Sequence, residues 1–337
     1  MRLPIVLFLA STAVEARSIS TKATWFVDAD ASSPGSGTRD DPYASIQYAL
    51  SRPSTVDGGT VLVLPGTYPE LVDFLGKDVV LASTDGPEVT TIDATIQFSF
   101  EQSAVKLRNG EGPRCTLSGF TIRGGAGTQV VEPVSGLTLF AGGGILAIRS
   151  APTIRDCILV GNFADVGGGI YAENARLTLE RCTIEENEAW YFGGGIFLHE
   201  SKVKLSGVTI RANLTINNRG GGTHAFGGNL DVAESVLDGN SGAAGGGNVA
   251  LGQGAFLTMT GVVVRSGFTL DGNGGGVLAD SSTVQLERCS FARNTAGDPS
   301  SNREGGALHV SNGDLEIRES IFTRNASARG GAVFLSG

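Results

Sequence analysis

The chain has 337 residues, 50 of them glycine, with a formal net charge of −9 at pH 7 and a sequence pI of about 4.9. Glycine is about twice as frequent as in an average domain, which indicates that many tight corners are needed. An acidic chain without a basic patch lacks the charge that attracts phosphate backbones, so a nucleic-acid partner is excluded.

Residues 1–16 predict a secretory signal peptide. Arg2 supplies the positive charge, and an apolar run extends from Leu3 to Val14. Val14 and Ala16 stand at the −3 and −1 positions of a cleavage site before Arg17. The run is too short to span a bilayer and no other segment is a candidate, so we expect a secreted or cell-surface protein without a membrane span after signal removal. A membrane anchor or a misassigned start is the alternative.

Residues 17–75 predict a strand–helix–strand cap. We expect strands at Thr24–Asp28 and Gly59–Pro65. Between them, Tyr43–Leu50 predicts a short amphipathic helix with Ile46 and Leu50 on one face. A solenoid must cover its first apolar cross-section, and a helix laid over that end would do so. The intervening aspartates could form a calcium loop, but their spacing matches no metal motif and favours a solvated loop (Asp28, Asp30, Asp40 and Asp41).

From residue 76 to residue 337 the chain is a tandem repeat. Each repeat has a glycine cluster, a residue that opens a fixed interval, and an asparagine seventeen residues later. The opening residues are Ile145, Ile170, Ile196, Thr223, Val277 and Leu308, and the asparagines are Asn162, Asn187, Asn213, Asn240, Asn294 and Asn325. One interval is a residue longer, from Val249 to Gly267. Repeats start 25 to 31 residues apart and vary only between an asparagine and the next glycines, which indicates a solenoid.

Apolar and polar residues alternate inside the fixed interval, as at Leu177, Leu179, Cys182 and Ile184. A period of two predicts strands and excludes helical or leucine-rich repeats. Two strands before the asparagine and a short third strand after the glycines give three strands per coil. The predicted fold class is therefore an all-β parallel β-helix with coils about 4.8 Å apart.

The six asparagines predict a structural ladder at one corner of the coil. Asparagine tolerates the left-handed backbone region, and its amide can bond both the local backbone and the asparagine stacked above it. Gly125 and Gly267 take the same position in their own coils, where glycine would also accept a positive φ.

Two patterns resemble known families. Pro42–Leu50 (PYASIQYAL) and Val63–Tyr68 (VLPGTY) resemble the first segment of right-handed parallel β-helix proteins of the pectin-lyase-like superfamily. Gly305–Leu308 (GGAL), Phe322–Asn325 (FTRN) and Phe291–Asn294 (FARN) resemble the repeats of the polymorphic outer-membrane proteins, in which G-G-A-[ILV] alternates with F-x-x-N. The resemblance implies a right-handed coil, export and an adhesin-like role at the cell surface.

Enzymes of the pectin-lyase-like superfamily gather carboxylates on one outward face. In the two outward rows of the strand after the glycines, the only carboxylates are Glu173 and Asp280, four coils or about 19 Å apart. That separation is too large for glycoside hydrolysis or a shared calcium ion. We therefore assign no catalytic residue, metal or cofactor. A binding and structural module is favoured over the alternative, a polysaccharide lyase, glycoside hydrolase or epimerase.

The same outward rows carry aromatic side chains and predict a binding strip. Its residues are Tyr171, Phe197, His199, His224 and Phe226, with Trp190 and Tyr191 entering from a neighbouring loop. Exposed rings can stack on sugars, so the expected partner is an extracellular polysaccharide or another cell-surface component. The alternative, which the sequence leaves open, is that residues 126–141 fold over these rings as an ordinary satellite core.

Two further features concern the cysteines and the C-terminus. Cys157 and Cys182 share an inward position in neighbouring coils and are close enough for a disulfide, although two buried reduced thiols are favoured. The chain stops at Gly337 inside a new strand, so we expect the β-helix to be truncated or to continue there. An uncapped coil could also support end-to-end association.

Overall fold

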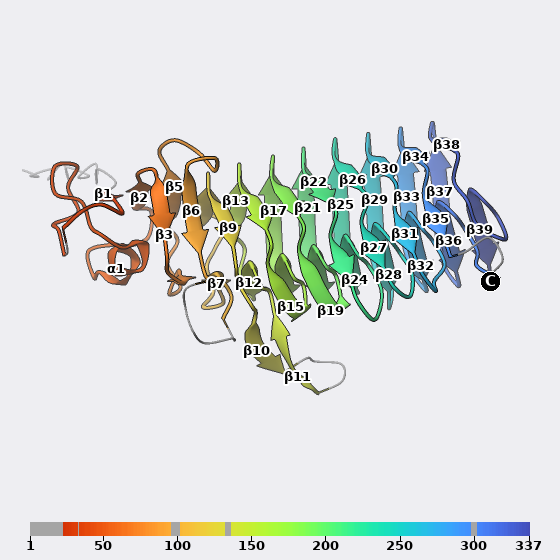
Figure 1. Ribbon diagram of the computed structural model, residues 1–337, viewed down its shortest axis with the longest axis horizontal. Helices are drawn as coiled ribbons and strands as arrows, with labels where there is room; N and C mark the ends of the chain where they lie inside the picture. The colour runs from red at the N-terminus through yellow and green to blue at the C-terminus, as the bar shows by residue number, and fades with distance from the viewer. Residues whose placement is uncertain (1–22, 33, 96–101, 132–135, 298–301) are drawn as a thin grey trace, which may run out of the picture.

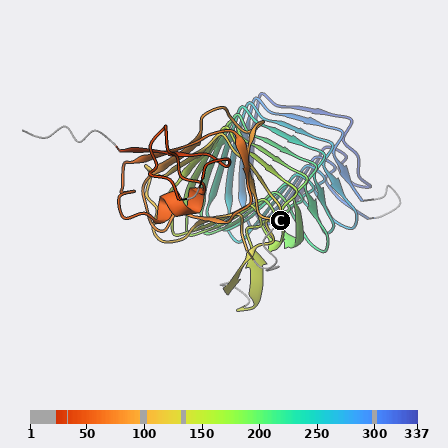
Figure 2. The same ribbon diagram turned by 60° about the vertical axis from the view of Figure 1, so that its left-hand side comes forward.

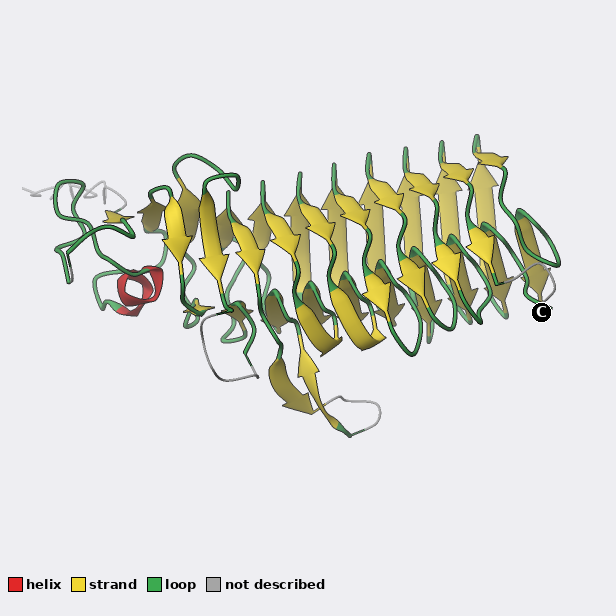
Figure 3. Cartoon of the chain, viewed as in Figure 1, coloured by secondary structure: helices red, strands yellow, loops and turns green. Residues whose placement is uncertain are grey.

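The computed structural model describes residues 23–32, 34–95, 102–131, 136–297 and 302–337, so the predicted signal peptide lies outside the described residues. Over these ranges the chain winds into an elongated solenoid of strands with one short helix near its N-terminal end (Figures 1 and 3). The all-β, right-handed parallel β-helix predicted from the sequence is confirmed. Within the same ranges, no helix is long and apolar enough to cross a membrane.

The described coils are built from four sheets, which we name S1 to S4: strands of S1, S2 and S3 occur along the whole solenoid, and S4 is present from residue 128 to residue 296. The ten strands of S1 are β4 (Val72–Asp73), β7 (Val105–Leu107), β12 (Ile145–Ile148), β16 (Ile170–Glu173), β20 (Ile196–His199), β24 (Thr223–Phe226), β28 (Val249–Gly252), β32 (Val277–Asp280), β36 (Leu308–Ser311) and β39 (Val333–Ser336). The eleven strands of S2 are β1 (Thr24–Val27), β2 (Thr60–Val63), β5 (Val80–Ser83), β8 (Thr116–Ser118), β13 (Thr153–Arg155), β17 (Arg176–Glu180), β21 (Lys202–Ser206), β25 (Asn229–Ala233), β29 (Phe256–Thr260), β33 (Thr283–Glu287) and β37 (Asp314–Arg318).

The ten strands of S3 are β3 (Gly66–Tyr68), β6 (Thr90–Asp93), β9 (Thr121–Arg123), β14 (Ile158–Val160), β18 (Thr183–Glu185), β22 (Thr209–Arg211), β26 (Val236–Asp238), β30 (Val263–Arg265), β34 (Ser290–Ala292) and β38 (Ile321–Thr323). The eight strands of S4 are β10 (Thr128–Val131), β11 (Thr138–Ala141), β15 (Phe163–Val166), β19 (Glu188–Phe192), β23 (Leu214–Thr215), β27 (Ser241–Gly242), β31 (Phe268–Thr269) and β35 (Thr295–Ala296). Neighbouring strands are parallel, except that β10 and β11 form an antiparallel hairpin.

Sheets S1 to S3 correspond to the three strands per coil predicted from the sequence, and S4 is an additional sheet. It is built from the segment of variable length, and β23, β27, β31 and β35 have only two residues each. Strands this short carry no readable alternation, which is why the sequence pattern did not show them. The sheets also begin ahead of residue 76, because β1 to β4 are hydrogen-bonded into S1, S2 and S3.

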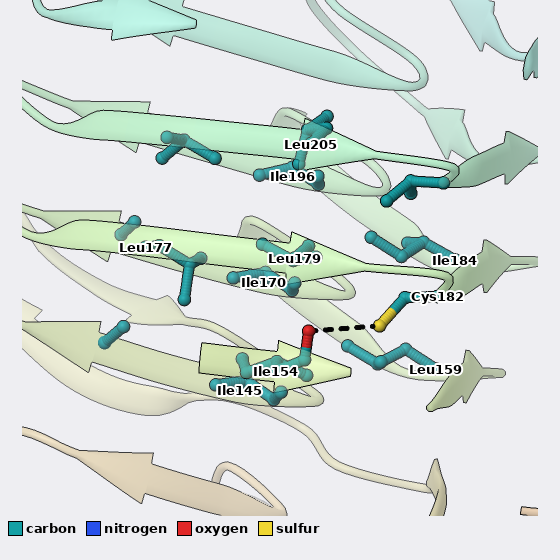
Figure 4. Packing of buried hydrophobic residues seen from close by; sticks show 14 of the residues in the cluster. Ile145, Ile154, Leu159, Ile170, Leu177, Leu179, Cys182, Ile184, Ile196 and Leu205 are labelled. Carbon is teal, nitrogen blue, oxygen red and sulfur yellow. Dashed lines mark hydrogen bonds between the residues drawn. The ribbon is translucent and has the colours of Figure 1, made fainter. Parts of the chain in front are cut away.

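The main core is a column of apolar side chains contributed by S1, S2 and S3. Inward residues stack on their equivalents in the neighbouring coils, as Figure 4 shows for Ile154, Leu179 and Leu205. These three side chains are buried, whereas Thr178, which precedes Leu179 in the same strand and points to the other side, is half-buried. Stacking like on like lets each strand complete its hydrogen bonds and bury its apolar face at the same time.

The helix α1 (Ile46–Ser51) starts three residues later than the sequence predicts, and its buried face lies against the first coil (Ile46, Ala49 and Leu50). Two backbone N–H groups in the first turn of this helix are bonded by a residue from the solenoid. The Glu70 carboxylate accepts from the backbone nitrogens of Ile46 at 2.8 Å and Gln47 at 2.9 Å. A carboxylate at this end also interacts favourably with the helix dipole, so Glu70 holds the helix in place.

The corner between S3 and S4 is turned by one left-handed residue per coil. That residue is Gly161, Glu186, Ala212, Gly239, Ser266, Arg293 or Arg324. It precedes the repeat asparagine, or Gly267, by one position. The prediction that the asparagines, or Gly125 and Gly267, adopt the positive φ is therefore wrong. Asparagine is required at this corner for its amide and not for its backbone conformation.

The corner between S4 and S1 requires glycine for two reasons. Gly167 has a φ of 65°, and a Cβ there would lie 2.3 Å from the carbonyl oxygen of Ile170. A Cβ on Gly168 would lie 2.2 Å from the carbonyl oxygen of Glu188. Backbones of successive coils approach so closely at this corner that no side chain fits, which explains the repeated glycine clusters.

The asparagine side chains form a hydrogen-bonded ladder inside the corner between S3 and S4. Asn187 Nδ2 donates to Asn213 Oδ1 at 3.0 Å, and Asn213 Nδ2 donates to Asn240 Oδ1 at 2.9 Å. Asn213 Oδ1 also accepts from the backbone nitrogen of Asn187 at 3.0 Å. The same side-chain bonds join Asn162 to Asn187 and Asn294 to Asn325.

Asn248 continues this ladder through the coil in which Gly267 takes the asparagine position. Its Oδ1 accepts from Asn240 Nδ2 at 2.7 Å, and its Nδ2 donates to Asn294 Oδ1 at 3.2 Å. A Cβ on Gly267 would lie 2.4 Å from Asn248 Nδ2. Glycine therefore makes room for an amide that arrives from the other side of the corner, and the ladder is unbroken.

Replacing Asn213 or Asn248 by alanine is expected to lower the free energy of unfolding by roughly 3 kcal/mol. Each change leaves several buried donors and acceptors unbonded, at about 1–3 kcal/mol for each group. Urea denaturation followed by circular dichroism measures the loss. Asn217→Ala, at an exposed side chain, serves as the control and should change the value by less than about 0.5 kcal/mol. An unchanged unfolding midpoint for Asn248→Ala would contradict the continuity of the ladder.

Candidate binding surface

Sheet S4 folds back over the outer face of S1, and its hairpin β10–β11 projects from the body of the solenoid (Figures 1 and 2). Between the two sheets lies a second apolar cluster, separate from the main core, formed by Ala141, Leu146, Val166, Tyr171 and Phe197. The rings of Tyr171 and Phe197 are stacked with centroids 5.6 Å apart. Tyr171 is 0 % exposed and Phe197 is 4 % exposed. These two rings point away from the main core, as predicted, but they are not accessible to a sugar.

The part of the predicted strip that lies on S1 is therefore not an exposed surface, and the satellite-core alternative describes that part correctly. Val130 and Leu139 of the hairpin pack against the cluster, so described parts of the segment 126–141 do cover it. Phe226 is half-buried and stacks on His199 at 5.8 Å. Alternation alone could not reveal this burial, because it shows on which side of a strand a residue lies and not whether a further layer covers that side.

All three histidines of the chain are buried on the same outer face of S1. His199, His224 and His309 are 5–7 % exposed, and the Nδ1 atom of each has no hydrogen-bond partner among the described residues. The His224 ring lies edge-to-face with the rings of Phe192 and Phe197, at centroid distances of 4.8 Å and 5.6 Å. Burial, reinforced by the charge of Arg219, lowers the pKa of His224 to about 3. His224 is thus a neutral packing residue at physiological pH.

Trp190 and Tyr191 are the two predicted strip residues that remain accessible, at 42 % and 37 % exposed. They are neighbours in β19, where the register with β15 shifts between Ala164 and Val166. A bulge of this kind places two residues of one strand opposite one residue of the next and turns both outward. The bulge explains how consecutive residues of one strand can both face solvent.

The outer face of S4 carries two columns of side chains along the solenoid axis. The strand registers define the first column as Phe163, Glu188, Leu214, Ser241, Phe268 and Thr295. From β19 onward, the residues two positions after the first column form the second column, which is Trp190, Ile216, Ala243 and Leu270. The backbone nitrogens of Ile216 and Ala243 donate to the carbonyl oxygens of Ala189 and Thr215, so the coils stay in step beyond the two-residue strands. In β15 the same position is held by the half-buried Asp165. Phe163, Leu214 and Phe268 are 40–42 % exposed, and Leu270 is 63 % exposed. This face is the most accessible apolar surface on the middle coils.

A polar hollow of about 280 Å³ lies beside this face, between the loops that join S4 to S1 and the outer face of S1. Its charged and titratable lining residues are Arg219, Asp271, Asp280, Arg303 and His309. Arg303 Nη2 bonds Asp271 Oδ1 at 3.1 Å, and Ser311 Oγ donates to Asp280 Oδ1 at 3.3 Å. Arg219 forms no ion pair with the residues that the structure describes. Burial lowers the pKa of His309 as well, so its imidazole is neutral at pH 7.

Most of the hollow was missed by the sequence analysis. Asp280 was identified as an outward carboxylate, but Arg219, Asp271 and Arg303 lie in segments of variable length that have no fixed position in the repeat. The structure places Asp271 in the same hollow as Asp280, which the repeat pattern could not show. Glu173, the other outward carboxylate, instead accepts from the hydroxyl of Tyr171 at 2.9 Å.

Cys157 and Cys182 are free, buried thiols. Cys157 Sγ donates to the carbonyl oxygen of Arg155 at 3.2 Å, and Cys182 Sγ donates to that of Ile154 at 3.5 Å (Figure 4). Burial raises the pKa of the Cys157 thiol well above its usual range. Since the thiolate is the reactive form, the Cys157 thiol is a packing group. Cys182 is buried in the same apolar core at 1 % exposed.

Comparisons with known proteins identify the class of fold. Residues 79–241, just under half of the chain, match the family described as right handed beta helix region. The structure is similar to pectate lyase Pel9A, with a TM-score of 0.55, 14 % sequence identity, and coverage of 93 % of this chain and 80 % of that one. It also matches pectin methylesterase from carrot (TM-score 0.42, 13 % identity, 94 % and 89 % coverage) and PfbA, a surface adhesin of Streptococcus pneumoniae (TM-score 0.39, 10 % identity, 82 % and 85 % coverage). A comparison with curated proteins found no match.

The chain is therefore a right-handed parallel β-helix with the pectin-lyase-like fold. At these levels of identity the similarities show the fold alone, and the fold carries several unrelated activities.

The buried His224 predicts a specific pH dependence of stability. Its pKa is about 3 in the folded protein, below the value of about 6.5 in the unfolded chain, so the unfolded chain binds the extra proton first. The stability of the wild type should fall by about 1.4 kcal/mol per pH unit below about pH 6.5 through this residue alone. His224→Phe, which keeps an aromatic ring beside Phe192 and Phe197 but cannot take up a proton, should remove that part of the slope. Urea denaturation at several pH values between about pH 7 and pH 4 measures the slope of the unfolding free energy against pH. Equal slopes for the two proteins would contradict the lowered pKa of His224.

Proposed function

We propose that this protein is a secreted or cell-surface β-helix that binds polysaccharide on the outer face of sheet S4. The observation that carries the proposal is the alignment of exposed apolar side chains along that face, with Phe163, Trp190 and Phe268 among them. Sugar rings present C–H faces that pack on such side chains while their hydroxyls stay hydrated. Apolar groups gathered on one face of a soluble protein typically mark an interaction surface.

The polar hollow supports the same function because it adjoins the apolar face. Leu270, the most exposed residue of the second column, is followed directly by Asp271 of the hollow. Two guanidinium groups and two carboxylates line the hollow, and His309 is neutral, so their charges cancel. A balanced set of donors and acceptors suits the hydroxyl groups of a neutral sugar better than the charge of an acidic one.

The resemblance of the repeats to polymorphic outer-membrane proteins supports display outside the cell. Their G-G-A-[ILV] and F-x-x-N patterns occur here at Gly305–Leu308 and Phe322–Asn325. In such a setting a rigid solenoid would present the S4 face to polymers of the surroundings, so an adhesin-like role follows from the proposed binding.

Removing the exposed rings should weaken binding without changing the fold. The double variant Trp190→Ala/Tyr191→Ala is expected to bind insoluble polysaccharide at least tenfold more weakly, which corresponds to about 1.4 kcal/mol. Depletion assays with a panel of polysaccharides measure the change. Val89→Ala, an exposed apolar residue elsewhere on the solenoid, is the matched control and should bind like the wild type. Unchanged binding by the double variant would remove the S4 face from the proposal.

A second candidate function is polysaccharide cleavage in the polar hollow. The observation in its favour is that Asp271 and Asp280 line one hollow together with His309. Against it, the Asp271 side chain is 77 % exposed and ion-paired with Arg303, which is the environment of a charged carboxylate. Glycoside hydrolysis needs one carboxyl group that apolar surroundings keep protonated. Binding is therefore the better-supported function.

A screen for cleavage separates the two candidates. We expect no depolymerisation or epimerisation of pectate, alginate or neutral β-glucans, with or without added calcium. The screen should use chromatography of the products, with Asp280→Asn beside the wild type to identify any activity of the hollow. Product formation by the wild type that disappears in Asp280→Asn would place the protein among the enzymes.

A further inference from the structure

We infer that the S4 face binds a neutral, extended β-1,4-linked polysaccharide whose sugar rings repeat their orientation every second residue, with the chain parallel to the solenoid axis. This inference rests on the proposed function and specifies the polymer. It is carried by a periodicity in the first column of S4, where apolar and polar residues alternate from coil to coil.

The alternation follows the strand registers without interruption. Phe163, Leu214 and Phe268 occupy the first, third and fifth coils of the column, and all three are 40–42 % exposed. The coils between and after them carry the half-buried polar residues Glu188, Ser241 and Thr295. Exposed apolar groups therefore recur every second coil.

This spacing is set by backbone hydrogen bonds and is consequently regular. Adjacent parallel strands lie about 4.8 Å apart, so the apolar residues recur about every 9.6 Å and span about 19 Å. In a flat β-1,4-linked chain each sugar advances by nearly the same length as one coil, and alternate sugars present the same face. Every second sugar would then place the same ring face over Phe163, Leu214 and Phe268, and the sugars between them would meet the polar side chains.

The charges on the face are consistent with a neutral polymer. In the first column only Glu188 carries a charge, and the second column from Trp190 to Leu270 has none. An acidic polysaccharide would find no cation within these two columns and would meet the Glu188 carboxylate. From Trp190 to Leu270 the second column adds an apolar border, which a flat ribbon of sugars can cover and a helical polysaccharide cannot.

The decisive variant keeps the composition of the face and changes only its spacing. Ser241→Phe/Phe268→Ser moves one aromatic ring by a single coil, so that the apolar residues no longer lie two coils apart. Wild type and variant are compared in depletion assays with insoluble cellulose, insoluble β-1,4-mannan and helical amylose. Urea denaturation shows whether the variant is folded, and Leu214→Ser, which removes the middle apolar residue, provides a second test with little structural risk.

We expect the wild type to bind cellulose or mannan at least tenfold more tightly than amylose, and both variants to lose at least tenfold on the preferred polymer. Equal binding by the wild type and the exchanged variant would overturn the inference that the two-coil spacing selects the polymer, while the proposed function would stand. Preference for amylose would overturn the extended chain. Failure of the wild type to bind any polysaccharide would overturn the proposed function together with this inference.

Discussion

The side-chain amide ladder at the corner between S3 and S4 is the constraint on which the rest of the molecule depends. Five of the ladder residues are followed directly by an outward residue of S4, as in Asn162–Phe163 and Asn213–Leu214. A buried amide bonded to the amides above and below it has one permitted height and orientation, since a shift would leave several polar groups unbonded. The ladder therefore fixes both the stacking of the coils and the positions of the side chains that S4 presents.

The space between S4 and S1 has opposite properties at its two ends. Near the hairpin, S4 covers the outer face of S1 and encloses an apolar cluster around Tyr171 and Phe197. From β23 onward the S4 strands have only two residues, and further along Arg219, Asp271 and Asp280 line an open hollow. The first outward residue of the S1 strands stays buried in both regions, as at Tyr171, Leu278 and His309. What changes along the S4 segment is the kind of surface beside this face, which is apolar near the hairpin and a polar hollow further along. The coils stack in the same way in both regions, because the ladder lies outside the S4 segment that varies in length.

Much of the fold could be predicted from the sequence, because every coil repeats the same solution. Inward residues such as Leu179 and the ladder asparagines recur at fixed intervals. Asn248 was missed because it supplies its amide from the opposite side of the corner, in a coil where the usual position holds Gly267. The burial of Tyr171 was left open because a covering layer has no period of its own. The S4 column could have been found as the residue after each asparagine, but the two-residue strands gave no reason to look there.

The most direct test of the account is a crystal structure of the protein with a bound β-1,4-linked oligosaccharide. The account predicts sugar rings along the outer face of S4, parallel to the solenoid axis, with alternate rings over Phe163, Leu214 and Phe268. An oligosaccharide bound within the polar hollow or on another sheet, with the S4 face bare, would contradict it.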